Sequence, residues 1–455
     1  MKRFTGAFAE PRMPKIYPFR GVHFNTAKFG SDLSKVTTQP YDKINPKLQD
    51  EYYRKHDNNL IRVILRKDEP GRDKYQDAAA TLNEWLKSDV LVQDAKPALY
   101  VYHQLYRTPQ GPKTRKGLSA LVQIDEPGKG RILPHEQTHT GPKIDRFNLI
   151  NATKTHTEQV FFLYSDPEKV VNKICDEVAR GSPDFQATDE LGDTHKVWKL
   201  EDPAKIQQIQ KALDAKECII ADGHHRYETS WNFKQEMAKK GVKATGTETP
   251  DNVLATLVNM EDDLTIFGTH RLCYDIPNFD LAKVLSGAKK AFDIREYPFS
   301  NASEEKTARA EMLEDMKVEG MTKPCFGVAA RQSQAHYLFV VRDVKAAAAQ
   351  VKEKKSEDWR SLDVCLLHTL ILEALLGIGP QQIAAEKNVE FLRSADEAIE
   401  KVRATGPYQV AFLVNPVRLD QIKRVVKNGE KFPQKSTDFY PKLLTGLLLC
   451  KLNVS

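Results

Sequence analysis

A short apolar strand that leads directly into a helix constrains the fold of this chain more than any other feature. Residues 218–221 (CIIA) are typical of a buried strand, and apolar residues recur at helical spacing over 227–239. Only Asp222-Gly223-His224-His225-Arg226 stands between them. The sequence therefore predicts an α/β junction at which a strand stops at a glycine and a helix begins at once.

This junction is a candidate anion site. The first backbone N–H groups of a helix have no partner within the helix, and the helix dipole adds positive charge there. Arg226 supplies a guanidinium that matches phosphate oxygens, and Asp222 is a hard oxygen ligand suited to Mg²⁺. His224 and His225 can donate to phosphate or accept a proton. The alternative is a turn glycine followed by histidines that only cap and pack.

A second polar motif, LPHEQTHT at 133–140, places Glu136 between histidines and threonines. A carboxylate in this setting can act as a general base toward a substrate hydroxyl. Gly-Pro at 141–142 is predicted to open a helix, on which Lys143 and Arg146 lie one turn apart and can face one anion. A polar loop before a capped helix is the alternative. A zinc site from His135 with His139 or His224 lacks the spacing of known zinc motifs.

A third motif lies near the C-terminus, where residues 429–437 read GEKFPQKST. The Lys-Ser-Thr ending resembles a P-loop, but the required glycine is missing upstream, so a Walker A motif is excluded. Lys435, Ser436 and Thr437 remain as a lysine and two hydroxyls able to bind an anion or an amino-acid carboxylate. A solvated loop is the alternative.

The length of 455 residues predicts more than one domain. We expect a flexible tail at 1–15, a first domain at 16–275 with both HEQ and DGHHR, and a C-terminal α+β domain at 276–455. Strands are predicted at Leu60–Leu65 and Val160–Tyr164, among others, with amphipathic helices between them. The fold class is therefore α+β.

Composition limits the function classes. With 40% hydrophobic and 29% charged residues the chain is globular, and a net charge of +6 without basic blocks disfavours a nucleic-acid partner. No secretory signal and no run of about 18 apolar residues is present, which predicts no membrane partner. Six cysteines without a CxxC pair suit free thiols and a cytoplasmic location. The oligomeric state is left open.

Taken in order, the motifs over about 16–450 resemble a large bacterial and archaeal family related to the free serine kinases. The matching segments are PFRG at 18–21, PYD at 40–42, LPHEQT at 133–138, KIDR at 143–146, ADGHHRYET at 221–229, THR at 269–271, LDV..LH at 362–368 and PQKSTDFYPKL at 433–443. The resemblance implies a sulfiredoxin/ParB-like core in the first domain, with insertions, followed by the C-terminal α+β domain. It also implies phosphorylation of free L-serine to O-phosphoserine, with ATP or ADP as donor and Mg²⁺.

The resemblance also implies roles for individual residues. Glu136 is expected to be the catalytic base, and Asp222 a catalytic residue and metal ligand. Substrate binding is assigned to Lys435, Ser436 and Thr437. Nucleotide or phosphate binding is assigned to a larger set, namely Gly223, His224, His225, Arg226, His135, Lys143 and Arg146.

The chain departs from the shorter kinases in three places. The interval between HEQ and DGHHR is longer, which predicts an insertion within 147–215, and the region before residue 130 has no counterpart. Gln39 stands where the family usually has a second proline. Three other functions stay open: a ParB-like nucleotide-binding regulator without kinase activity, a metal-dependent phosphohydrolase, and a non-catalytic interaction protein.

Overall fold

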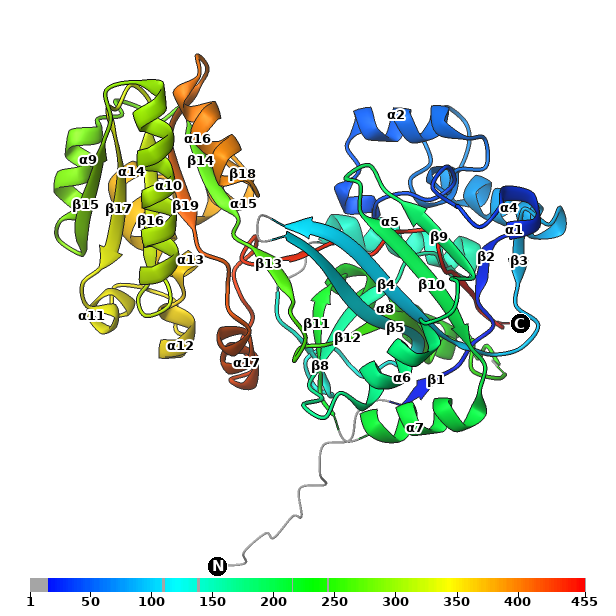
Figure 1. Ribbon diagram of the computed structural model, residues 1–455. Coiled ribbons are helices and arrows are strands. Elements are labelled where there is room, and N and C mark those ends of the chain that lie inside the picture. Colours follow the sequence, from blue (N-terminus) through cyan, green and yellow to red (C-terminus); the bar gives the residue numbers. More distant parts are fainter. Residues whose placement is uncertain (1–14, 109–110, 137–139, 215, 244, 455) are drawn as a thin grey trace, which may run out of the picture. The chain divides into compact units, whose positions relative to one another are not determined.

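The computed structural model describes residues 15–108, 111–136, 140–214, 216–243 and 245–454. Most of the tail predicted at 1–15, and Gln137, Thr138 and His139 of the second motif, lie outside these residues. Two compact units form the chain (Figure 1). The first comprises 1–134, 138–264 and 441–455, and the second comprises 135–137 and 265–440. The last fifteen residues, which the sequence analysis placed in the C-terminal domain, thus belong to the first unit, and His135 and Glu136 belong to the second.

The first unit is built on a mixed nine-stranded sheet in the order β6-β11-β8-β12-β5-β4-β10-β9, with β1 added beside β5. Its β11/β6 and β12/β8 pairs are parallel and the others are antiparallel. The strands are β1 (Ile16–Tyr17), β4 (Leu99–Thr108), β5 (Gly111–Gln123), β6 (Ile132–Pro134), β8 (Val160–Tyr164), β9 (Phe185–Thr188), β10 (Thr194–Leu200), β11 (Cys218–Asp222) and β12 (Asn252–Asn259). A fold of the α+β class is confirmed for this unit, while the sulfiredoxin/ParB-like core stays a prediction.

The remaining elements of the first unit are helices and short strand pairs. The helices are α1 (Thr26–Phe29), a 3₁₀ turn (Tyr41–Lys43), α2 (Pro46–Lys55), α3 (Ile61–Ile64), α4 (Lys74–Lys87), α5 (Thr140–Thr153), α6 (Val170–Val178), α7 (Pro203–Leu213) and α8 (His224–Lys239). The short pairs join β2 (Val22–Phe24) to β3 (Leu91–Gln93) and β7 (Thr155–His156) to β21 (Cys450–Lys451). None of the helices in the described part of the chain has the length and apolar character needed to cross a bilayer.

The predicted strand at Leu60–Leu65 is wrong, because these residues form the helical turn α3. Asn59 accepts the N–H of Ile61 through its side chain, and Ile64 N–H donates back to the Leu60 carbonyl. Ile61, Val63 and Ile64 are all buried, so the run needs no alternation between two faces. A short apolar segment does not distinguish a buried turn from a strand.

The two faces of the large sheet differ in chemistry. Alternate residues of the strands, such as Val101, Leu118 and Phe162, join a hydrophobic core with residues of α6 and α7. The other face bears polar side chains, because Gln104 of β4 is paired with Arg115 of β5 and with His195 of β10. This polar face carries one of the two sets of site residues described below.

The second unit contains an antiparallel six-stranded sheet in the order β15-β17-β16-β19-β14-β18, and a separate β13/β20 pair. Its strands are β13 (Thr265–Phe267), β14 (His270–Tyr274), β15 (Phe292–Pro298), β16 (Cys325–Ala330), β17 (Ala335–Val341), β18 (Val389–Leu392), β19 (Tyr408–Val414) and β20 (Asp438–Tyr440). Its helices are α9 (Leu281–Ala288), α10 (Ala302–Glu319), α11 (Val344–Ala348), α12 (Glu357–Arg360), α13 (Asp363–Leu366), a π-helix (Leu367–Glu373), α14 (Ala374–Leu376), α15 (Pro380–Ala384), α16 (Ala395–Arg403) and α17 (Leu419–Lys427).

Candidate functional site

Asp222 reaches the polar face of the first unit through an irregularity in β11. Ile220 is paired with Phe162 of β8, but Asp222 is paired with Phe161, so two residues of β11 correspond to one of β8. Such a bulge re-aims the side chains that follow it. Asp222 therefore lies on the same face as Phe161 and opposite to Ile220, whose side chain joins the apolar core.

The strand and helix at this junction form as predicted, with Gly223 as the residue before α8. Its φ of 86° lies in the left-handed region, where glycine is favoured. A Cβ at this position would lie 2.9 Å from Nε of Arg226. As the N-cap residue, Gly223 has no side chain of its own to cap α8, and its missing Cβ leaves room for the Arg226 guanidinium.

Both carboxylate oxygens of Asp222 bind cations. Nη2 of Arg226 donates to Oδ2 at 2.7 Å, and Nζ of Lys442 donates to Oδ1 at 3.2 Å. Arg226 also donates to the carbonyl of Gln159, which fixes the other side of its guanidinium. Burial alone would raise the pKa of Asp222, but the charges of Lys442 and Arg226 lower it well below its usual range. Asp222 is therefore ionised, with two cations on it.

Lys442 was not among the residues singled out from the sequence. It comes from the C-terminal segment, 220 residues after Asp222, and its side chain is 9% exposed. Its membership of the PQKSTDFYPKL segment was the available signal, but nothing in the sequence indicated its partner. The structure thus adds a cation to the predicted site.

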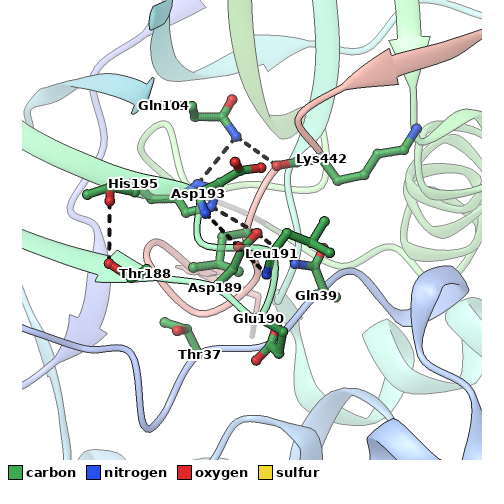
Figure 2. A network of polar contacts seen from close by, with 12 residues as sticks. Thr37, Gln39, Gln104, Thr188, Asp189, Glu190, Leu191, Asp193, His195 and Lys442 are labelled. Carbon is green, nitrogen blue, oxygen red and sulfur yellow. Dashed lines mark hydrogen bonds and ion pairs between the residues drawn. The ribbon is translucent and has the colours of Figure 1, made fainter. Parts of the chain in front are cut away.

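A buried polar network fixes the backbone at Lys442 (Figure 2). Nε2 of Gln104 donates to the Lys442 carbonyl at 2.7 Å and lies 3.3 Å from Nδ1 of His195. The hydroxyl of Tyr102 accepts the N–H of Leu444 and lies 2.7 Å from the same Nδ1. Lys442 and Leu444 are thus both held through residues that contact His195.

The network continues from His195 to Gln39. Nε2 of His195 lies 3.4 Å from Oδ2 of Asp189, and Nε2 of Gln39 donates to the same oxygen at 2.8 Å. A proline at 39 has no side-chain donor for this contact. Gln39 is therefore connected to the C-terminal segment through Asp189, His195 and Gln104.

The two cations predicted on α5 already have carboxylate partners. Lys143 Nζ donates to Glu228 at 2.8 Å. Arg146 is 5% exposed and contacts Asp145 and Glu158, and its guanidinium lies over the ring of Tyr41. An anion at these residues must therefore compete with carboxylates of the chain.

The second unit brings His135 and Glu136 together with the predicted Lys-Ser-Thr loop. Residues 136 and 432 form a parallel bridge, and Phe432 donates its N–H to the His135 carbonyl at 2.7 Å. His135 is fully buried, and its Nε2 lies 2.7 Å from Oγ1 of Thr437. Oε1 of Glu136 accepts the backbone N–H of Lys435 at 3.1 Å.

Arg271 of β14 also contacts this loop. Its Nη2 donates to the Lys435 carbonyl at 3.2 Å, so the Lys435 backbone is bound by Glu136 through its N–H and by Arg271 through its oxygen. Lys435 has a φ of 56°, a left-handed conformation that is costly for a residue with a Cβ. The hydroxyl of Ser436 donates a hydrogen bond to the Pro433 carbonyl. These contacts fix the loop against Glu136.

The predicted site residues thus fall into two sets. Asp222, Gly223 and Arg226 form one constellation with Lys442 in the first unit, where His224 is buried and His225 is half-buried. His135, Glu136 and the loop at 435–437 form another in the second unit. Across the described residues, no group of three His, Cys, Asp or Glu side chains is arranged to bind a metal ion.

Residues 16–365 match the family described as protein of unknown function (DUF1015). The chain belongs to this family. No curated protein matches it.

Solved structures similar to this chain include a free serine kinase in complex with AMP, at 12% identity and a TM-score of 0.32, covering 72% of this chain and 92% of the kinase. SbnI with a C-terminal truncation, from Staphylococcus aureus, gives 10% identity and a TM-score of 0.34 over 73% of this chain and 87% of SbnI. A conserved hypothetical protein from Pyrococcus furiosus gives 13% identity and a TM-score of 0.31 over 72% and 95%.

Proposed function

We propose that this protein is a nucleotide-dependent phosphotransferase that acts on a small hydroxyl acceptor, with free L-serine as substrate and O-phosphoserine as product. The observation that supports this most is the constellation at the start of α8. Asp222 is paired with both Arg226 and Lys442 where α8 begins after Gly223. Fixed cations at a helix N-terminus are suited to phosphate groups.

Phosphoryl transfer needs charge neutralisation and positioning more than covalent participation of the protein. In the proposed reaction, the bond from the terminal phosphorus of ATP or ADP to its bridging oxygen breaks, and a bond from the acceptor oxygen to that phosphorus forms. Arg226, Lys442 and the N-terminus of α8 neutralise the phosphate charge. Glu136 takes the proton of the acceptor hydroxyl as general base.

The loop at 435–437 is proposed to bind the acceptor. Ser436 is buried and already bonded to the Pro433 carbonyl, whereas the side chain of Lys435 is half-exposed and pairs with the exposed Glu386 at 3.2 Å. Its ammonium group is thus accessible to a carboxylate. Because the same loop contacts Glu136, acceptor binding and the base are coupled through one segment.

Magnesium fits this site only together with a nucleotide. Mg²⁺ is usually bound through one or two protein carboxylates plus substrate phosphates. Asp222 supplies one such carboxylate, with Lys442 and Arg226 on its oxygens. In our proposal Asp222 would hold the metal of a metal–nucleotide complex in place of one of these cations, and the ion would supply further charge neutralisation to the phosphates. Because the six cysteines are free thiols, we place this activity in the reducing cytoplasm.

The test is a reaction screen followed by phosphorus NMR. The full chain is incubated with Mg²⁺, ATP or ADP, and single free amino acids. The proposal expects a phosphomonoester signal of O-phosphoserine that needs both nucleotide and serine. Nucleotide binding without transfer to any hydroxyl acceptor would instead identify a regulatory protein, and release of phosphate from phosphorylated compounds without nucleotide would identify a phosphohydrolase.

A further inference from the structure

Arg115 on β5 is a buried cation without a carboxylate partner. It is 2% exposed, and its Nε and Nη2 both donate to a single neutral acceptor, Oε1 of Gln104. Among the residues that the structure describes, no carboxylate oxygen lies within the 4.0 Å that defines an ion pair with its guanidinium. Asp222 and Asp193 act on it electrostatically, but only from beyond that distance.

The side chain of Arg115 lies on the same face of the sheet as Asp222. Its guanidinium stacks over the ring of Phe161, with 4.4 Å from the central carbon to the ring centroid. Phe161 is the β8 residue paired with Asp222 across the bulge. Arg115 therefore occupies the polar face beside the candidate phosphate site.

Arg115 is also linked to Lys442 by one side chain. Gln104 accepts from Arg115 with its amide oxygen and donates to the Lys442 carbonyl with its amide nitrogen. The orientation of the amide is thus determined by both contacts. Gln104 thus connects Arg115 directly to the backbone of the segment that carries Lys442.

An uncompensated charge in this position is costly. Removing a charge from water without a counter-ion costs several kcal/mol, and apolar residues of similar size often replace buried charges without loss of stability. Burial accordingly lowers the pKa of Arg115 to about 10. The neighbouring cations differ, since Arg226 and Lys442 are both paired with Asp222. Arg115 thus differs from Arg226 and Lys442 in having no carboxylate partner among the described residues.

We propose that Arg115 binds an oxyanion of the ligand beside Asp222, either a phosphate of the nucleotide or the carboxylate of the amino acid. This assignment rests on the proposed phosphotransferase function and adds a binding residue to it. The planar guanidinium, fixed by Gln104 and Phe161, presents its remaining N–H groups in a set geometry that suits either anion.

Calorimetric titration of Arg115→Met tests the proposal. Lys116→Met is the matched control, because Lys116 is the next residue of β5 and its charge pairs with Asp176 at the surface. Four probes are used: ADP, adenosine, L-serine and L-serinamide. Loss of a charge-assisted bidentate contact should weaken binding by about ten- to a hundredfold.

If the phosphate is the anion, Arg115→Met loses affinity for ADP and keeps that for adenosine. If the carboxylate is the anion, it loses affinity for L-serine and keeps that for L-serinamide. Either result supports the proposal and identifies whether the nucleotide or the amino acid provides the anion that Arg115 binds. Affinities of Arg115→Met for both ADP and L-serine that match those of Lys116→Met would overturn it.

The melting temperature of Arg115→Met distinguishes a ligand-binding role of Arg115 from a purely structural one. Without ligand, Arg115→Met should melt at or above the temperature of the wild type, because the variant no longer buries an unpaired charge. A lower melting temperature with unchanged affinities shows a structural role and contradicts the proposal. If Arg115→Met does not fold, Arg115→Lys replaces it, with the same loss of affinity expected because the planar fork is gone.

The proposed function can fail independently of Arg115. If the wild type binds neither nucleotide nor amino acid, the oxyanion site at Arg115 is tested on its own. The test is thermal shift with inorganic pyrophosphate and with acetate at constant ionic strength. A rise in melting temperature in the wild type that Arg115→Met lacks supports an oxyanion site without kinase activity. No difference between the two proteins refutes the site.

Discussion

Nζ of Lys442 lies 3.2 Å from Oδ1 of Asp222, although 220 residues separate the two in the chain. The C-terminal segment belongs to the same compact unit as β11, and Gln104 fixes its backbone at Lys442. The candidate phosphate site is therefore complete only when the last residues of the chain have folded onto the sheet.

Lys442→Met should lower nucleotide affinity by about tenfold or more, because one of two cations beside the phosphates is lost. The variant should also have a higher pKa at Asp222, since Lys442 is a main cause of its depression. Nucleotide titration by calorimetry measures the first effect. Lys451→Met is the control, because Lys451 lies in the same segment and its Nζ bonds to Asn83 and Thr153, with no carboxylate partner among the described residues. Equal affinities of the two variants would argue against a role for Lys442.

Gly223→Ala should cost about 1–2 kcal/mol of stability, as expected for a left-handed residue with a Cβ. It should also weaken nucleotide binding, because the new methyl group displaces the guanidinium of Arg226. Gly241→Ala separates the two effects, since Gly241 has a φ of 66° and open space where its Cβ would be. Urea unfolding should show similar losses for both variants, and only Gly223→Ala should lose affinity. An intact affinity in Gly223→Ala would contradict the proposed role of the junction.

Arg271→Met should lower kcat while the protein stays folded. The variant removes the donor to the Lys435 carbonyl, and the left-handed Lys435 is then free to relax away from Glu136. Some stability should also be lost, because Arg271 is buried and donates to the carbonyls of Thr269 and Lys435. Steady-state kinetics and thermal melting measure both quantities. Arg403→Met, which removes an exposed arginine of the same unit, should leave kcat unchanged.

Stability should fall as the pH drops from about 6.5 toward 4. Burial lowers the pKa of His103, His156 and His270 to about 4, so these rings are neutral in the fold but take up protons when unfolded. The unfolded state then binds more protons, which makes stability rise with pH in this window. Each ring contributes about 3 kcal/mol at most.

Urea unfolding between pH 4.5 and 7.5 measures this dependence. His156→Gln keeps a donor for the Asn252 carbonyl and should flatten the slope in the acidic range. Above pH 7 the difference between variant and wild type should be constant. An unchanged slope in His156→Gln would show that this ring is not a source of the acid sensitivity.

Local patterns predicted the elements that position the site. Val160–Tyr164 is β8 with the expected bounds, and the glycine junction after β11 appears where the composition changes at Gly223. Local signals suffice there because a buried strand and a helix start each have their own residue preferences.

Long-range relations could not be predicted in the same way. The bulge that turns Asp222 to the polar face depends on pairing with β8, and the contacts of Arg115 and Lys442 depend on strand order. None of these leaves a local pattern. The contact of Gln39 could not be predicted either, because its partner Asp189 lies 150 residues away in the chain.

The most direct test of the central claim compares the wild type with Glu136→Gln in transfer from ADP or ATP to L-serine. Glutamine keeps an oxygen that can accept the Lys435 N–H but cannot take a proton at neutral pH. We predict that the wild type forms O-phosphoserine, and that Glu136→Gln forms at least about a hundredfold less while binding nucleotide with unchanged affinity. Equal turnover in the two proteins, or no transfer by the wild type despite nucleotide binding, would contradict the account.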